Sequence, residues 1–195
     1  MAKLAVLASG KGSNFEALVL ALRASSRAHE CVLLLADRKD ALALARAERL
    51  GIPARLVAYG GRPRREAEAE LADAIRGSGA DLVALAGFMR ILGPDFVRLH
   101  RGRMVNVHPS LLPKWPGRDA IRRAYEAGET VFGVSVHYVD EGMDTGPVIS
   151  CSSFTPERGS SLESIEARVH EIEHRLFPET LIGLLDRIER DGKAK

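Results

Sequence analysis

Short apolar runs alternate with helical patterns along residues 1–107, and this alternation constrains the fold more than any other feature of the chain. Apolar runs predict strands at residues 3–8, 31–36, 54–57, 81–86 and 104–107. The segments between them predict helices at residues 14–23, 41–50, 64–76 and from Pro94 onward. Because strands that alternate with helices form parallel sheets, we expect an α/β fold with a doubly wound, mostly parallel sheet.

The second half of the chain has a different pattern. Prolines recur at its start, at positions 109, 113 and 116, before a helix expected at residues 119–127. An alternating strand, a second strand within hairpin reach and two helices separated by Pro178 follow, at residues 131–139, 147–151, 161–176 and 181–188. We expect an antiparallel strand in this half, and a single domain over residues 1–195.

Composition excludes several classes of protein. No run of 18 apolar residues is present, so we expect no membrane-spanning helix, and the first apolar run leads into a glycine-rich turn rather than a cleavage site. These features predict a cytoplasmic protein in which Cys31 and Cys151, each in an apolar run, are buried free thiols. The net charge is only +2 and the basic residues are dispersed, which argues against binding of nucleic acid or a membrane surface.

The amide side chains are unusually rare. The chain has no glutamine and only two asparagines, Asn14 and Asn106, which fits a thermophilic source or a GC-rich genome. A composition that avoids asparagine makes these two positions candidates for function.

A glycine-rich turn, Ser9-Gly10-Lys11-Gly12-Ser13-Asn14, joins the first predicted strand to the first helix. Its glycines allow a tight approach to a ligand, and the amides of a helix N-terminus with a serine hydroxyl form an anion site. The alternative is a structural turn capped by Ser13 or Asn14. We favour phosphate or carboxylate binding, because the turn lies at the carboxyl ends of the strands.

The sequence from His170 to His174 matches H-E-x-x-H on a predicted helix, which is the pattern of zinc proteases. The remainder of the chain predicts a doubly wound sheet, no cysteine-rich second site is present, and a short pattern in a glutamate-rich helix arises readily by chance. We therefore predict no metal.

Asn106 and His108 lie at the carboxyl end of the fifth predicted strand, two residues apart and therefore on one side of it. An amide beside an imidazole is a plausible oxyanion-binding pair for acyl transfer, although an isolated N-x-H is more often structural. An acidic, glycine-flanked loop at residues 140–147 follows a later strand, and its simplest interpretation is an exposed turn. If it folds against His108, Asp144 could keep the imidazole charged and help to accept a proton.

These residues together resemble the folate-dependent formyltransferases. The specific motifs are His-Pro-Ser-Leu-Leu-Pro-Lys-Trp-Pro-Gly at residues 108–117, with Asn106 before it, and Asp-x-Gly-Pro-Val-Ile at residues 144–149. Within the family, the chain is similar to the branch that formylates glycinamide ribonucleotide, through Gly12-Ser13-Asn14, residues 86–92, residues 167–169 and Glu173-His174. The resemblance extends from residue 3 to about residue 188.

The resemblance implies a role for each half of the chain. Residues 1–107 would be the nucleotide- or phosphate-binding half, in which Gly12, Ser13 and Asn14 hold the phosphate of the ribonucleotide. Residues 108–195 would bind folate and carry the catalytic residues. Glu173 would contact the ribose or the glycinamide. The Leu112–Pro113 peptide bond would be cis.

The resemblance also implies a pterin pocket for 10-formyltetrahydrofolate, the formyl donor. Its cofactor-binding residues would be Arg65, Met89, Arg90, Ile91, Leu92, Asn106 and Glu141. Arg64 could take the place of Arg65, and the loop at residues 141–144 would close over the pterin. The implied enzyme works in purine biosynthesis on small molecules, as a monomer or homodimer.

As a hypothesis, the glycinamide amine attacks the formyl carbon, and His108 and Asn106 stabilise the oxyanion while Asp144 assists proton transfer. Related alternatives are a formyltetrahydrofolate hydrolase, a sugar-nucleotide formyltransferase and a methionyl-tRNA formyltransferase, which carries an additional tRNA-binding domain. A different class would be a non-catalytic nucleotide-binding module, which would have no need of the set Asn106, His108 and Asp144.

Overall fold

A computed structural model describes residues 1–193 of the chain. One seven-stranded sheet has the order β3-β2-β1-β4-β5-β6-β7. Its strands are β1 (Lys3–Ala8), β2 (Glu30–Ala36), β3 (Ala54–Leu56), β4 (Leu82–Leu85), β5 (Met104–His108), β6 (Phe132–Tyr138) and β7 (Val148–Phe154). Strands β1 to β5 pair in parallel, β6 is antiparallel to β5, and β7 is antiparallel to β6. The predicted fold class is confirmed.

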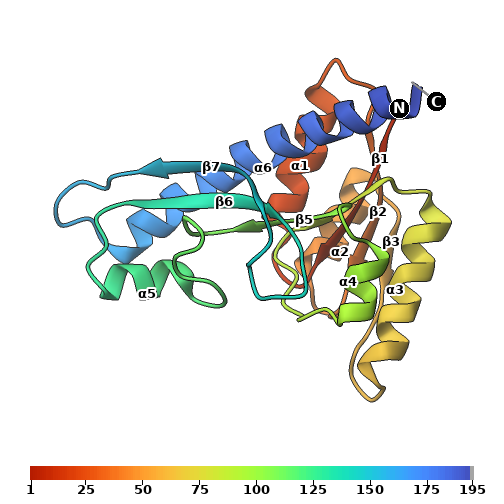
Figure 1. Ribbon diagram of the computed structural model, residues 1–195, viewed down its shortest axis with the longest axis horizontal. Helices are drawn as coiled ribbons and strands as arrows, with labels where there is room; N and C mark the ends of the chain where they lie inside the picture. The colour runs from red at the N-terminus through yellow and green to blue at the C-terminus, as the bar shows by residue number, and fades with distance from the viewer. Residues whose placement is uncertain (194–195) are drawn as a thin grey trace.

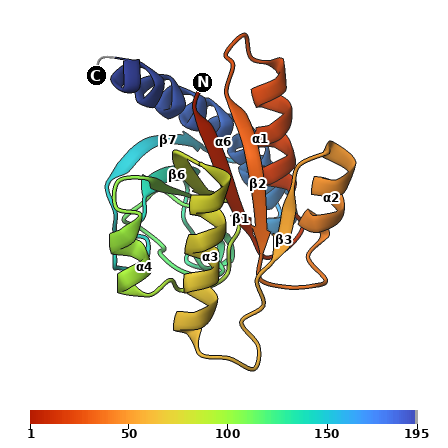
Figure 2. The same ribbon diagram turned by 90° about the vertical axis from the view of Figure 1, so that its right-hand side faces the viewer.

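Helices cover both faces of the sheet, as Figures 1 and 2 show. They are α1 (Ser13–Ala24), α2 (Leu42–Leu50), α3 (Arg64–Ser78), α4 (Pro94–Leu99), α5 (Ala120–Glu126) and α6 (Leu162–Lys193). Leu4 and Val6 of β1 pack in one core with α1, α2, α5 and α6, whereas Ala5 and Leu7 pack in a second core with α3 and α4. Burial on both faces explains why the central strands are apolar throughout.

The strand order reverses at β1, which lies between β2 and β4. In open α/β sheets this reversal leaves a crevice at the carboxyl ends of the strands, where ligands bind. Ser9, just after β1, donates its backbone N–H to the carbonyl of Gly87, just after β4, at 3.1 Å. The glycine-rich turn, the end of β4 and the end of β5 therefore share one edge of the sheet.

The C-terminal helix corrects one prediction. Instead of two helices separated by Pro178, α6 is a single helix that contains this proline. A proline inside a helix costs about 3 kcal/mol, because it removes one hydrogen bond and crowds the preceding turn. Phe177, Leu181 and Leu185 are fully buried around it, and their burial offsets that cost.

The cysteines correct a second prediction. Both are free, and Cys31 of β2 is buried, but Cys151 is exposed. Cys151 lies on β7, which pairs only with β6 at the edge of the sheet, so its side chain lacks a second covering layer. An apolar run thus predicted the strand correctly and its burial wrongly.

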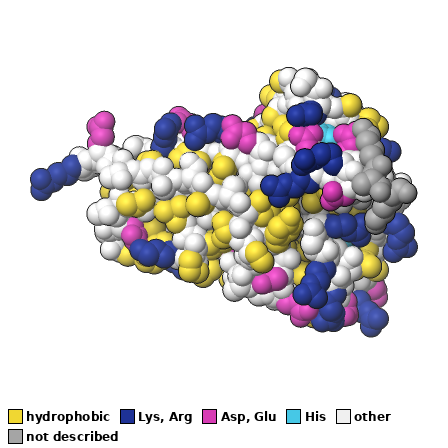
Figure 3. Space-filling view, turned by 45° about the horizontal axis from the view of Figure 1, so that its top comes forward, with side chains coloured by type: hydrophobic (Ala, Val, Ile, Leu, Met, Phe, Trp, Pro, Cys, Tyr) yellow, Lys and Arg dark blue, Asp and Glu magenta, His cyan; other side chains and the backbone are white. Residues whose placement is uncertain are grey.

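The surface shows no segregation of charge on the face drawn in Figure 3, where Lys and Arg side chains lie among Asp and Glu side chains. Within residues 1–193, no helix combines the length and the apolar character needed to cross a membrane.

We predict that Phe177→Ala lowers the free energy of unfolding by about 3–5 kcal/mol, because it empties a fully buried site between α6 and the sheet. Urea denaturation measures the change. Leu20→Ala, at a side chain of α1 that is 52% exposed, is the control and should change stability by less than about 0.5 kcal/mol. Equal effects of the two substitutions would contradict the packing described here.

Candidate active site

The pairing of β5 with β6 creates the centre of the site. Asn106 of β5 lies opposite His137 of β6, and the Asn106 Nδ2 is 3.1 Å from the His137 Nε2. His108 ends β5, and its Nε2 is 2.9 Å from the carbonyl oxygen of Trp115. Both imidazoles are buried.

Asp144 reaches this centre from the loop between β6 and β7. Its Oδ2 is 3.4 Å from the His108 Nδ1 and accepts the backbone N–H of Gly117 at 2.8 Å. Its Oδ1 is 3.4 Å from the Asn106 Nδ2 and 3.5 Å from the His137 Nε2. The convergence expected of Asn106, His108 and Asp144 is therefore present.

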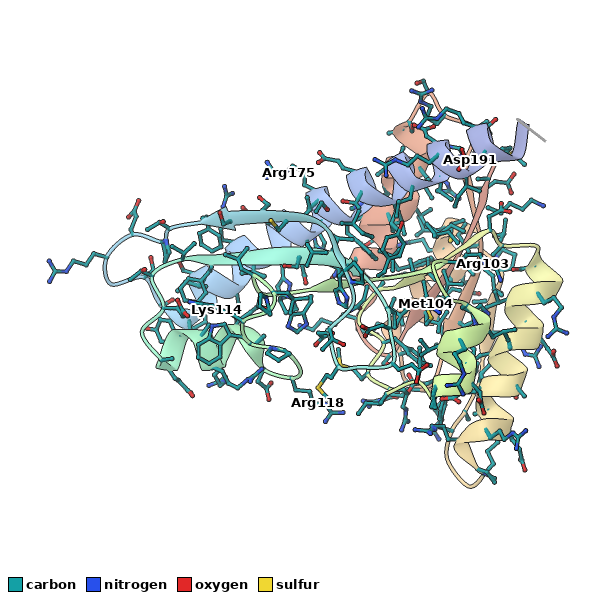
Figure 4. All side chains as sticks on the ribbon, viewed as in Figure 1. Arg103, Met104, Lys114, Arg118, Arg175 and Asp191 are labelled. Carbon is teal, nitrogen blue, oxygen red and sulfur yellow. The ribbon has the colours of Figure 1, made fainter. Side chains whose placement is uncertain are left out.

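The loop between β5 and α5 supplies backbone groups to both sides of the ion pair. It provides the Trp115 carbonyl for His108 and the Gly117 N–H for Asp144. Figure 4 shows this loop near the labelled Lys114 and Arg118, with the Arg118 side chain directed outward. The Leu112–Pro113 peptide bond is cis, as the resemblance implied.

Electrostatics keep Asp144 ionised although it is half-buried. Burial raises the pKa of its carboxyl group, but a hydrogen bond from His137, the Gly117 N–H and the charges of the two histidines outweigh this and lower the pKa to about 2. His108 faces an oxygen on each ring nitrogen, an arrangement that suits the doubly protonated imidazolium.

His137 is the site residue that the sequence analysis missed. Its Nδ1 donates to its own neighbour, the carbonyl of Tyr138, at 2.9 Å, so the neutral ring has an acceptor at Nε2 for the Asn106 amide. A protonated ring would instead donate from Nε2 to Asp144. The alternating pattern of residues 131–139 contained the signal, because the register opposite Asn106 brings His137 to the site.

A cavity of about 120 Å³, partly open to solvent, adjoins these groups. One wall is the segment after β4 and the other is the loop that carries Asp144, and the lining includes Arg90, Ile91, Leu92, Asn106, His137, Glu141, Met143 and Asp144. Apolar walls with a few convergent polar groups are typical of a small-molecule site.

The segment after β4 is fixed at three points. Met89 donates its backbone N–H to the Ser9 Oγ at 2.8 Å, and Gly93 donates to the buried Glu68 Oε1 at 2.8 Å. Between them, the Arg90 Nε donates to the buried Asp37 at 2.5 Å, and its guanidinium lies 5.0 Å from the centre of the Tyr59 ring. The Met89 side chain is itself 58% exposed at the rim.

Two of the expected residues lie away from this cavity. Arg64 and Arg65 line a separate depression between α3 and α4, and the Arg64 Nε is 3.6 Å from Glu68. Their roles toward folate stay predictions.

The glycine-rich turn has the features of an anion site. Gly12 precedes α1 with φ +73°, and a Cβ there would lie 2.7 Å from the backbone of Ala43, so only glycine fits. No side chain caps α1, contrary to the alternative in which Ser13 or Asn14 forms the cap. The first amides of this helix therefore remain for another acceptor.

Asn14 and Glu173 meet beside this turn, as the resemblance implied. The Asn14 Nδ2 donates to the Glu173 Oε2 at 3.3 Å, and Glu173 is buried. The Asn14 Oδ1 is buried and has no hydrogen-bond partner in the described part of the chain. A buried acceptor in this state is suited to a hydroxyl or N–H donor of a ligand.

The H-E-x-x-H pattern does not assemble as a metal site. The His170 Nδ1 contacts the Glu173 Oε2 at 2.8 Å, and Glu171 pairs with Arg168. Among residues 1–193, no group of three or more potential metal ligands comes together.

Comparison with known proteins assigns the family. A profile of the formyl transferase family matches residues 2–181. The chain belongs to the formyl transferase family. It is 40% identical over its full length to the full-length phosphoribosylglycinamide formyltransferase of Bacillus subtilis, and the resemblance inferred from the motifs is confirmed.

Other relatives agree with this assignment. The chain aligns over 98% of its length, at 44% identity, with 14% of the trifunctional purine biosynthetic protein adenosine-3 of Drosophila pseudoobscura pseudoobscura. Its fold matches the glycinamide ribonucleotide transformylase 1 structure from Geobacillus kaustophilus with a TM-score of 0.91 and 45% identity, covering 95% of this chain and 99% of that one.

The low pKa of Asp144 predicts a pH-dependent contribution to stability. A carboxyl group with a depressed folded-state pKa stabilises the protein above its unfolded value of 3.8, and this contribution is lost as the pH falls toward about 2. Asp144→Asn should therefore lower the free energy of unfolding by about 2 kcal/mol at pH 7, with the difference shrinking below pH 4. Urea denaturation across this range measures it, and a difference that stays constant with pH would contradict the assigned ion pairs.

Proposed function

We propose that this formyl transferase moves the formyl group of 10-formyltetrahydrofolate to the amine of N1-(5-phospho-D-ribosyl)glycinamide; the name of its full-length relative, phosphoribosylglycinamide formyltransferase, supports the acceptor. The observation that carries the proposal is the convergence of Asn106, His108 and Asp144, two of which, Asn106 and Asp144, line the cavity. The products are the N-formyl ribonucleotide and tetrahydrofolate, and the reaction is a step of purine biosynthesis.

The chemistry is a direct transfer. The glycinamide amine attacks the formyl carbon, a C–N bond forms, and the carbonyl oxygen becomes an oxyanion. The imidazolium of His108 and the amide of Asn106 are the donors that stabilise this charge. Collapse then breaks the bond between the formyl carbon and the folate nitrogen, and the proton lost by the amine moves to that nitrogen with help from Asp144.

The donors around Asp144 support its assignment as a fixed anion. With a pKa near 2 it stays ionised throughout the physiological range and faces the His108 Nδ1 as a fixed negative charge. It also accepts the Asn106 Nδ2 beside His137, so that one carboxylate orients both oxyanion donors.

The two substrates bind to different parts of the site. Residues 89–92 and the loop with Glu141 bind the pterin, and Asn106 contacts it beside the reacting carbon. The ribonucleotide lies on the glycine-rich turn, where Gly12, Ser13 and the α1 amides hold its phosphate. The unpartnered Asn14 Oδ1 and the carboxylate of Glu173 accept hydrogen bonds from its hydroxyl or amine groups.

The cellular location and the partners are also proposed, from the dispersed charge and from the pathway. The enzyme acts in the cytoplasm on small molecules, as a monomer or homodimer, and without nucleic acid or a membrane. A thermophilic source stays a prediction of the amide-poor composition.

The acceptor preference tests the function. We expect rapid tetrahydrofolate formation from 10-formyltetrahydrofolate only when glycinamide ribonucleotide is present. Parallel assays contain no acceptor, an amino-sugar nucleotide, or methionyl-tRNA. Deformylation without an acceptor would identify a hydrolase instead, and preference for the sugar nucleotide or the tRNA would identify the corresponding formyltransferase.

The oxyanion donors are tested by truncation. Asn106→Ala and His108→Ala should each lower kcat by about 10²–10³, with smaller changes in the two KM values, because these side chains act mainly on the transition state. Met89→Ala, at the exposed rim, is a matched control in the same site and should affect the folate KM alone. Near-normal turnover in His108→Ala would eliminate the proposed chemistry.

A further inference from the structure

Glu129 is a carboxylate outside the catalytic centre, and it is attached to the loop that serves this centre. It lies between α5 and β6, and its backbone N–H donates to the carbonyl of the buried Ala124 at 3.0 Å. Its Oε1 accepts the indole N–H of Trp115 at 3.3 Å and the Lys114 ammonium at 2.8 Å. The hydrogen bond from Lys114 lowers the pKa of Glu129, burial opposes this, and the hydrogen bond from Trp115 lowers it further, so the carboxylate is charged at neutral pH.

Trp115 is also held by α5 and by the core. The Arg123 guanidinium lies 5.9 Å from the centre of the Trp115 ring. It also donates hydrogen bonds to the carbonyls of Pro116 and Arg118. The ring packs against the core that includes residues of β6 and α6. The indole is therefore fixed by a carboxylate, a guanidinium and apolar contacts together.

The backbone of Trp115 needs this support. Its φ of 58° is a left-handed conformation, which a residue with a side chain adopts only where its surroundings hold it. In this conformation its carbonyl oxygen is 2.9 Å from the His108 Nε2. Two residues later, Gly117 donates its N–H to the Asp144 Oδ2 at 2.8 Å. The residue that Glu129 anchors is therefore part of the backbone on which both members of the ion pair depend.

We propose that Glu129 is a positioning residue for the catalytic centre. Its carboxylate fixes the Trp115 indole, and the indole keeps the loop carbonyl on His108 and the loop N–H on Asp144. Glu129 makes no hydrogen bond or ion pair with either of those two residues in the described part of the chain, so it acts on them through the loop. This inference rests on the proposed function for the reaction that the ion pair serves.

Fluorescence reports on the loop directly, because Trp115 is the single tryptophan of the sequence. We expect Glu129→Ala to move the emission maximum to longer wavelength, since the indole loses its hydrogen-bond acceptor and becomes more exposed to water. Glu129→Gln keeps an oxygen that accepts the indole N–H, and it should keep the emission of the unaltered protein. This measurement needs no substrate.

Turnover gives the functional measurement. Glu129→Ala should lower kcat about 10- to 100-fold, because a displacement on the order of 1 Å in a catalytic group costs up to about 10²-fold. Both KM values should stay nearly unchanged, since the displaced groups act on the transition state. Glu129→Gln should restore most of the turnover. Lys114→Ala removes the other partner of the carboxylate, which is 65% exposed, and should leave kcat nearly unchanged.

A double-mutant cycle separates positioning from general stability. Trp115→Phe keeps an aromatic ring but removes the N–H that Glu129 accepts. If the two side chains act through one hydrogen bond, Glu129→Ala should lower kcat much less in the Trp115→Phe background than in the unaltered protein.

Glu70→Ala is the matched control. Glu70 of α3 is paired with two arginines, and its side chain is 26% exposed, compared with 21% for Glu129. This substitution should change neither the emission maximum nor kcat, because these ion pairs lie outside the loop. The unfolding midpoints of the Glu70 and Glu129 variants should stay close to that of the unaltered protein, since exposed ion pairs contribute little to stability.

Three results would overturn the inference: an unchanged emission maximum or kcat in Glu129→Ala, a Glu129→Gln variant no better than Glu129→Ala, or effects of Glu129→Ala and Trp115→Phe on kcat that multiply as independent changes do. Failure of the proposed function is a separate outcome. The unaltered protein would then transfer no formyl group to the ribonucleotide, yet the emission shift in Glu129→Ala and its absence in Glu129→Gln would remain. The inference would then apply to the reaction that the same ion pair does serve.

Discussion

The site depends on the two strands that flank β5, because one is parallel to it and the other is antiparallel. On one side β4 runs parallel to it, so the segment after β4 leaves the same edge of the sheet as His108. On the other side β6 runs antiparallel, so it begins beyond the His108 end of β5, brings His137 opposite Asn106 and continues into the loop that carries Asp144. A sheet that stayed parallel beyond β5 would need a crossover helix there, and the loop with Asp144 would not follow directly from the neighbour of Asn106.

The ion pair between Asp144 and His108 depends on the groups around it. A half-buried carboxylate is costly unless charges and donors compensate for lost hydration, and Asp144 has two histidines and the Gly117 N–H for this purpose. The backbone that positions these groups is strained, because Trp115 and Asp144 both have positive φ, 58° and 55°. The geometry of the loop is therefore part of the electrostatics of the site.

Periodicity predicted the helices and strands because burial on two faces leaves a strong apolar signal, as in β1. Motifs predicted that Asn106, His108 and Asp144 meet, although they are distant in the sequence. Three features were beyond local patterns. The helix continues through Pro178 because tertiary burial of Phe177 overrides a local penalty, and Cys151 is exposed because strand order, which no apolar run encodes, makes β7 an edge. His137 required the register between two strands.

The molecule uses its charged groups in two different ways. Asp144 lies between two histidines, and its pKa is so low that no physiological change of pH neutralises it, so it remains a fixed acceptor for Asn106 and Gly117. Beside the glycine-rich turn, the buried carboxylate of Glu173 instead accepts the Asn14 amide and contacts the exposed ring of His170. Asp144 and Glu173 share no hydrogen-bond partner among the described residues, so the two carboxylates belong to different networks.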